Sequence, residues 1–229
     1  GPVAFKLKRE CNQKVIVKNI RFKSDDQSFL ETIVDYRGKE SYSKMITKLC
    51  EHSPRTEFIY KIITTEFKSV PGQQILVLSQ NKSLLVELNR RIGSSAELSS
   101  GFYVGGMKRA DLELSQSKNI ILATYAMAAE GLDIVTLTTL VLATPRTDIT
   151  QAVGRILRSP HERPLVVDIV DIHGCFRRQA AKRGKFYRKN EYTQFSGDSD
   201  SFPAVAKVAT AQRDKPRTCR LQLHPEDLN

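Results

Sequence analysis

Short runs of apolar residues alternate with amphipathic helical segments along most of the chain, and this alternation limits the fold more than any other feature. Four of these runs occupy residues 74–79, 119–125, 138–144 and 163–171. A strand that is apolar on both sides must be buried on both sides, as in parallel sheets that helices cover on two faces. Residues 14–22 alternate and are rich in β-branched side chains, and they are predicted as a further strand, as are residues 101–106. The sequence therefore predicts an α/β fold around a parallel sheet.

The segments between the strands carry helical spacing and helix-end signals. In residues 54–70 the apolar side chains fall on one face, and Pro54 suits the first turn. Asn81 is expected to cap a helix that ends at Gly93, and Asp148 to cap a helix that contains the letters QAVGRILR. Further helices are predicted at residues 42–51, 108–117 and 175–190.

The regular alternation begins near residue 74, so we expect a domain over residues 74–195. Residues 1–73 are interpreted as an N-terminal extension leading into it, with a polar loop or insertion at 23–41. The first two residues, Gly1 and Pro2, resemble a protease-cleavage scar. Residues 196–229 are polar with scattered prolines and are predicted to be an irregular tail. No internal repeat is visible.

The charge balance favours an anionic partner. The chain has 36 Lys and Arg against 25 Asp and Glu, a formal net charge of +11. Such an excess suits nucleic acid, nucleotides or an acidic membrane surface. No apolar run is long enough to span a bilayer, and no signal peptide is visible. The four cysteines fall neither in C-x-x-C pairs nor at zinc-site spacing, which is typical of reduced thiols in an intracellular protein.

The stretch TYAMAAEGLDI, residues 124–134, follows a predicted strand and carries a lone acid. Ligands of open parallel sheets bind beyond the carboxyl ends of the strands, where this loop is expected to run. Thr124 and the amides after it could hold a phosphate, Gly131 permits a tight turn, and Asp133 could accept hydrogen bonds from hydroxyls such as those of a ribose. The alternative is a buried loop in which Asp133 caps a neighbouring helix.

The stretch QAVGRILR, residues 151–158, places Gln151, Arg155 and Arg158 at i, i+4 and i+7 on one helical face. Two guanidinium groups and an amide on one face form a phosphate-binding surface. We expect both arginines on the polar face, where truncation would leave little cavity. The alternative is a surface helix with two solvated arginines.

The predicted helix at 175–190 carries seven Lys and Arg and no acid. Four of them form a stripe opposite an apolar face and are expected to lack acidic partners: Arg178, Lys182, Lys185 and Lys189. Their mutual repulsion would be relieved by a phosphate backbone, so we interpret the stripe as a nucleic-acid contact. The alternative is a solvated helix face.

Several motifs of the sequence together resemble those of a known family. ATYAMAAEGLDI followed by QAVGRILR looks like motifs V and VI of superfamily 2 helicases, and QILVLSQNKSLLVEL is similar to motif IV. YVGGMKRADLE resembles the segment that precedes motif V. The order fits the second RecA-like domain and covers about residues 74–192. The chain looks most like helicases of large DNA viruses, such as the poxvirus transcript-release helicase and relatives in African swine fever virus and giant viruses.

The resemblance implies a role for each motif residue. Arg155 and Arg158 would reach the γ-phosphate of ATP across a domain cleft, at least one as an arginine finger, and Gln151 would place the nucleotide or the attacking water. Asp133 would contact ribose, with Gly131 keeping its loop tight. Three residues at strand ends would hold the nucleic-acid backbone: Ser79, Gln80 and Thr124.

The chain has no G-x-x-x-x-G-K-[ST] phosphate loop and no acid pair after a strand that would bind Mg²⁺. The family carries both on its first RecA-like domain, so the chain looks like half of an enzyme that uses ATP and Mg²⁺. The implied partners are that first domain, DNA with RNA as an alternative, and the viral transcription machinery, with no membrane. The implied location is inside a cell, or in the virion and the host-cell replication site. Two other classes remain open: a non-catalytic RecA-like binding module, and a translocase subunit of a restriction or remodelling enzyme.

Overall fold

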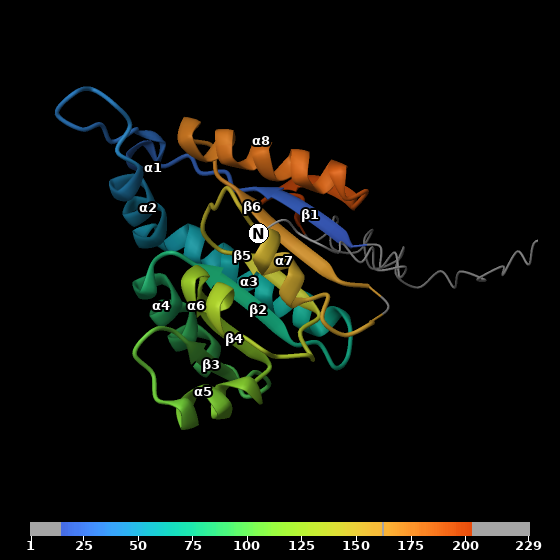
Figure 1. The fold of residues 1–229 in the computed structure, drawn as a ribbon. Helices are drawn as coiled ribbons and strands as arrows, with labels where there is room; N and C mark the ends of the chain where they lie inside the picture. Colours follow the sequence, from blue (N-terminus) through green and yellow to red (C-terminus); the bar gives the residue numbers. More distant parts are fainter. Residues whose placement is uncertain (1–14, 162, 203–229) are drawn as a thin grey trace, which may run out of the picture.

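One parallel sheet of seven strands runs through the protein, in the order β3-β4-β2-β5-β6-β1-β7 (Figure 1). The computed structural model describes residues 15–161 and 163–202. The strands are β1 (Ile16–Arg21), β2 (Ile75–Ser79), β3 (Ser100–Tyr103), β4 (Ile120–Thr124), β5 (Thr139–Leu142), β6 (Leu165–Val170) and β7 (Thr193–Asp198). All neighbouring strands are parallel, so their carboxyl ends share one edge, the C-terminal edge of the sheet. The predicted α/β class is confirmed.

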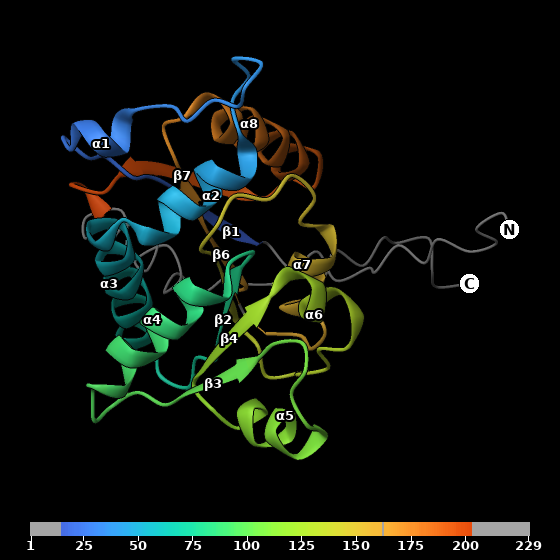
Figure 2. The ribbon, with the colours of Figure 1, turned by 90° about the vertical axis from the view of Figure 1, so that its left-hand side faces the viewer.

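Helices cover both faces of the sheet (Figure 2). One face carries α2 (Tyr42–Glu51), α3 (Ser53–Ser69) and α4 (Lys82–Gly93), and the other carries α6 (Tyr125–Glu130), α7 (Thr150–Arg155) and α8 (Gly174–Lys189). The short α1 (Gln27–Leu30) precedes α2, and α5 (Arg109–Gln116) packs against β3. In β2, Val77 packs into the core beneath α3 and α4, and Leu78 into the core beneath α6 and α7. This two-sided burial is what the continuous apolar runs predicted.

Some of the predicted helix ends are confirmed and others are not. Asn81 caps α4, because its side-chain oxygen accepts hydrogen bonds from the backbone N–H groups of Ser83 (2.7 Å) and Leu84 (3.3 Å). Asp148 accepts a hydrogen bond from the N–H of Thr150 at 3.0 Å, but it lies one residue before the N-cap of α7, which is Ile149. However, α7 ends at Arg155, where the chain passes into a turn shortly before Pro160. Arg158 therefore lies beyond the helix that was expected to carry it.

Some segments differ from their predictions. Residues 16–21 form the strand that was predicted at 14–22, but this strand, β1, lies between β6 and β7 in the main sheet instead of in an extension ahead of it. Residues 193–198 form β7, although TQFSGD is polar, because an edge strand needs only one paired neighbour. The expected loop at 126–133 is largely the short helix α6. The rest of the expected tail, residues 203–229, lies outside the described residues, as do Gly1 and Pro2.

Three buried ion pairs attach helices to the sheet. Lys18 of β1 binds Glu66 of α3 at 2.7 Å. Arg55 of α3 binds Asp171, just after β6, at 2.6 Å, and it also donates to the carbonyl of Ala143 at 2.9 Å. The third pair joins α8 to β6, because Arg183 binds Asp168 at 2.8 Å. No helix in the described part of the chain is long and apolar enough to cross a membrane.

Candidate functional site

The structure brings the motif segments together at the C-terminal edge of the sheet. Ser79 ends β2 and Thr124 ends β4, and the two are register neighbours in adjacent strands. Helix α6 begins directly after Thr124, and α7 packs against α6 on the same face (Figure 1). The residues at 79–80, 124–133 and 151–158, which lie far apart in the sequence, thus form one continuous region.

Arg155 lies inside this region rather than on its surface. Its side chain is 8% exposed, and its guanidinium donates to the backbone carbonyls of Leu132 (2.7 Å) and Ala129 (2.6 Å). Because α7 buries Ala152 and Val153 as well, Arg155 points toward α6 and not toward solvent. The expectation that Arg155 and Arg158 share a polar face is wrong, since Arg155 joins the two motif segments from within.

Arg158 has the opposite environment. It lies in the turn after α7, with its side chain 30% exposed, and it forms an ion pair with Asp133, whose side chain is 77% exposed. This exposure contradicts the alternative interpretation, in which Asp133 lay in a buried loop and capped a helix, and no helix N–H in the described part of the chain donates to its carboxylate. Gln151 is exposed on the first turn of α7. Two opposite charges expected to contact a nucleotide thus lie side by side where a ligand can reach them.

Gly131 ends α6 with φ −152° and ψ 1°. An added Cβ at Gly131 would meet no atom within 4 Å, so lack of space is not what requires glycine here. The carbonyl of Gly131 accepts a hydrogen bond from the hydroxyl of Tyr103 at 3.0 Å, which ties the loop to β3. Sequence reasoning did not anticipate this contact.

The end of β2 is more enclosed than expected. The hydroxyl of Ser79 is buried and bonds both the N–H and the carbonyl of Asn81 at 2.9 Å. The side-chain amide of Gln80 donates to the hydroxyl of Tyr42 (2.8 Å) and to the carbonyl of Pro145. Thr124 is half-buried and its side chain makes no hydrogen bond within the described residues. Of the three expected backbone contacts, Thr124 has the freest side chain.

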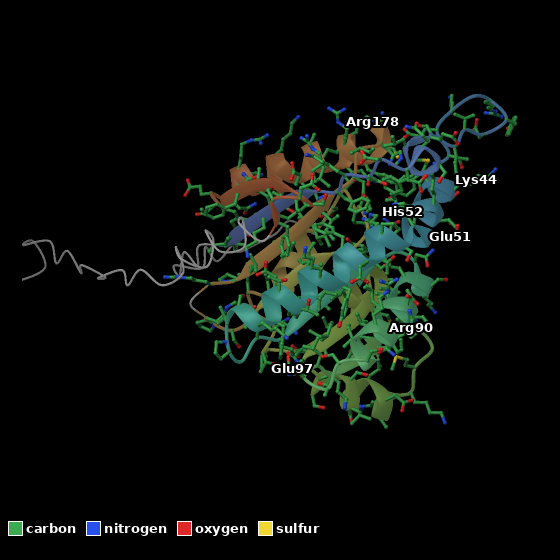
Figure 3. All side chains as sticks on the ribbon, turned by 180° about the vertical axis from the view of Figure 1, so that it is seen from behind. Lys44, Glu51, His52, Arg90, Glu97 and Arg178 are labelled. Carbon is green, nitrogen blue, oxygen red and sulfur yellow. The ribbon has the colours of Figure 1, made fainter. Side chains whose placement is uncertain are left out.

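The basic stripe of α8 is only partly as expected. Arg178 is not unpaired, because it binds Glu40, which lies in the loop before α2, at 2.9 Å. Its side chain projects outward from α8 (Figure 3). The sequence did not reveal this acid, since Glu40 lies far from α8 along the chain. Lys182, Lys185 and Lys189 are exposed and have no carboxylate partner among residues 15–161 and 163–202.

The described residues contain no group of three or more His, Cys, Asp or Glu side chains that could hold a metal ion. Cys50 and Cys175 are free and buried, and burial raises the pKa of Cys50 to about 11 and that of Cys175 to about 12. Neither thiol is therefore a ready nucleophile. The chemistry of this region rests on arginine, carboxylate and amide groups suited to phosphate and hydroxyl ligands.

Comparison by sequence finds viral relatives. Proteins named "Putative ATP-dependent RNA helicase" are 36% identical over 200 residues in Acanthamoeba polyphaga mimivirus and 33% identical over 95 residues in African swine fever virus. The first match covers 84% of this chain and 38% of the relative, and the second covers 40% and 19%. The chain thus spans well under half the length of these relatives. No protein-family model matches it.

Comparison by structure finds the same fold in solved helicase structures. T4 UvsW superposes with a TM-score of 0.62 at 17% identity, over 82% of this chain and 41% of that one. The C-terminal domain of the DEAD-box protein Dbp5 superposes with a TM-score of 0.54 at 15% identity, over 68% of this chain and 91% of that domain. At these identities the likeness establishes the fold, a RecA-like parallel sheet.

Proposed function

We propose, from the premise that this chain belongs to the superfamily 2 helicases as their second RecA-like domain, that it is one half of an ATP-dependent nucleic-acid helicase or translocase. The first RecA-like domain would carry the phosphate loop and the Mg²⁺ ligands that this sequence lacks. The observation that supports the proposal best is the solvent-accessible ion pair of Arg158 and Asp133. Arg155 holds the adjacent backbone in place through its hydrogen bonds to the carbonyls of Ala129 and Leu132.

The finger role falls to Arg158. A finger must lie at the surface, because it reaches a phosphate bound by another domain, and the side chain of Arg158 is 30% exposed. Arg155 fixes the carbonyls of Ala129 and Leu132 and thereby sets the position of both motif segments. Asp133 would bind the ribose hydroxyls, and Gln151, exposed on the first turn of α7, would place the nucleotide or the attacking water.

The nucleic-acid backbone would run along the C-terminal edge, where Thr124 has the freest side chain. Gln80 and Ser79 would shape this edge through their contacts with Tyr42 and Asn81 and present backbone groups to the strand. Because the viral relatives are named RNA helicases, we propose RNA as the first substrate to test, beside DNA. A role in viral transcription belongs to the same proposal.

The test is ATP hydrolysis by the full-length protein with Arg158 replaced. Arg158→Ala is expected to lower nucleic-acid-stimulated kcat by on the order of 10³-fold, because the transferring phosphoryl group loses a charge-assisted contact. Arg158→Lys should recover little, since lysine lacks the planar fork. Phosphate release is measured with saturating RNA and, separately, with saturating DNA.

The matched control is Arg90→Ala, which removes an exposed arginine from α4, paired there with Glu87. Its activity should equal that of the unchanged protein. Near-normal turnover of Arg158→Ala would sink the finger assignment. Turnover by the 229-residue chain alone would show that its ATP site is complete without a first domain, against the proposal. A non-catalytic binding module would show no turnover even at full length.

A further inference from the structure

Within the residues that the structure describes, few arginines lack a partner, and those few lie on α8 or next to it. In the described part of the chain, the arginine side chains with no ion pair, hydrogen bond or aromatic contact are Arg21, Arg177 and Arg188. Two of the three belong to α8. Arg21 is the last residue of β1, which pairs with β6. Helix α8 follows β6 in the chain. Exposed arginines elsewhere, such as Arg90 and Arg109, bind glutamates of their own helices.

Arg21 and Arg177 line the same cavity. It has a volume of about 260 Å³ and lies between the ends of β1 and β6 and the first turns of α8, where Val170, Ile172 and Ala180 complete its wall with Asp171. The carboxylate of Asp171 is already bound by Arg55. A cavity with two free guanidinium groups and a neutralised acid is suited to a phosphate group.

An acid on the neighbouring strand β7 is also occupied. Asp198 is the register neighbour of Arg21 in β7, but its carboxylate binds Lys23 at 2.6 Å and accepts a hydrogen bond from the N–H of Ser201 at 3.0 Å. These contacts hold the pKa of Asp198 well below its usual range, at about 2. Among residues 15–161 and 163–202, neither Arg21 nor Arg177 forms an ion pair with a carboxylate.

The cavity opens at the edge that would carry the nucleic acid. Sheet order places β6 two strands from β2, roughly 10 Å along the C-terminal edge. Beyond Arg177, the outer face of α8 continues with Lys182, Lys185 and Lys189, none of which has an acidic partner in the described residues. Arg188 lies near the far end of the same helix. A chain of positive groups thus leads from the cavity along α8.

From these observations we infer that the cavity of Arg21 and Arg177, with the outer face of α8, is a second binding site for the phosphodiester backbone of a nucleic-acid strand. The inference rests on the proposed function and extends it, because the site lies apart from Thr124 and from the Arg158–Asp133 pair. Such contacts read no bases, so the site is indifferent to sequence and weakens with salt.

The test is fluorescence-anisotropy binding of single-stranded RNA and single-stranded DNA to the full 229-residue chain at several salt concentrations. The cavity variant is Arg21→Gln with Arg177→Gln. It is expected to bind roughly tenfold more weakly, because charge-assisted contacts are lost. Loss of two phosphate contacts should reduce the slope of log K against log salt by about 1.4. The helix variant, Lys182→Gln with Lys185→Gln and Lys189→Gln, should reduce it by about 2.

The matched control is Lys61→Gln with Lys118→Gln, which removes the same charge as the cavity variant from α3 and from the end of the sheet opposite the cavity. Its affinity and salt slope should stay close to those of the unchanged chain. If the control loses as much affinity as the cavity variant, the loss comes from the change in net charge, and the inference is overturned. Unchanged binding by the cavity variant would also overturn it, as would an unchanged chain that binds inorganic phosphate but neither oligonucleotide. The Arg158 test is separate, so the proposed function can survive any of these results.

Discussion

Two arginines three residues apart play opposite parts in this protein. Arg155 is buried and donates to the carbonyls of Ala129 and Leu132, whereas Arg158 is partly exposed and pairs with the exposed Asp133. Burial of a guanidinium is tolerated only when its donors are bound, and two strong bonds to carbonyls meet much of that need. The motif spacing singled out both side chains as candidates, but it could not reveal which of them turns inward.

Truncation of the two arginines should change the free energy of unfolding by different amounts. Arg155→Ala is expected to lower the free energy of unfolding by about 2–4 kcal/mol, because two carbonyls lose their donors and a cavity opens. Arg155→Met, which keeps most of the volume but no donor, should cost nearly as much. Arg158→Ala should change stability by less than about 1 kcal/mol, as exposed pairs contribute little. Urea unfolding of the three variants measures this, and equal losses at both positions would contradict it.

At the scale of elements, α8 shows what sequence patterns capture and what they miss. Its extent was predicted closely from the run of basic residues and the small or aromatic residues on its inner face. The burial of Arg183 was not predicted. Arg183 donates two hydrogen bonds of 2.8 Å to the carboxylate of Asp168 in β6, and the hydroxyl of Tyr187 donates to the same carboxylate at 2.9 Å. A signal was present, because a lone acid within the apolar strand LVVDIV needs a buried partner.

The partner itself could not be read from the sequence, since several basic residues follow and only tertiary packing selects Arg183. The same holds for Lys18 in β1 and its partner Glu66. Strand β7 was missed for another reason: its polar residues carry no apolar pattern, and its place depends on β1 having a free side. Sheet class, strand positions and motif segments came from local patterns, whereas pairing across the molecule did not.

The link between α8 and β6 can be tested by breaking one partner and then both. Arg183→Met leaves Asp168 buried without its cation, and it is expected to lower stability by about 3–5 kcal/mol. Adding Asp168→Asn should restore part of that loss, because the buried charge is gone and Tyr187 keeps an acceptor. Thermal and urea unfolding of the single and double variants provide the comparison. A double variant less stable than Arg183→Met would refute this account.

At the scale of the whole molecule, β1 to α3 belong to the same body as the motif segments. Strand β1 lies between β6 and β7, and α3 contributes Ile59, Ile62 and Ile63 to the core beneath β2. The sequence suggested a domain that begins at residue 74, because the regular alternation starts there. Continuity of pattern along the chain and continuity of the core in space are different properties, and the core includes the earlier residues.

A boundary experiment follows from this placement. A fragment of residues 15–202 is expected to be soluble and to unfold cooperatively, whereas a fragment of residues 74–202 should aggregate. The shorter fragment exposes the apolar face that α3 covers and leaves the edge of β6 unpaired. Size-exclusion chromatography and circular dichroism melting distinguish the two. A monomeric, cooperatively melting short fragment would show that β1 to α3 are dispensable for the fold.

The position of β1 also sets an order of events during synthesis. Ile16 pairs with Leu165 and with Thr193, so β1 leaves the ribosome long before either neighbour exists. At usual rates of translation the delay is on the order of ten seconds. Through that interval its apolar residues have no sheet to join, while β2, β4 and β5 can already pair with one another. This sheet must therefore form from its middle strands, and β1, made before them, is among the last of its strands to take its place.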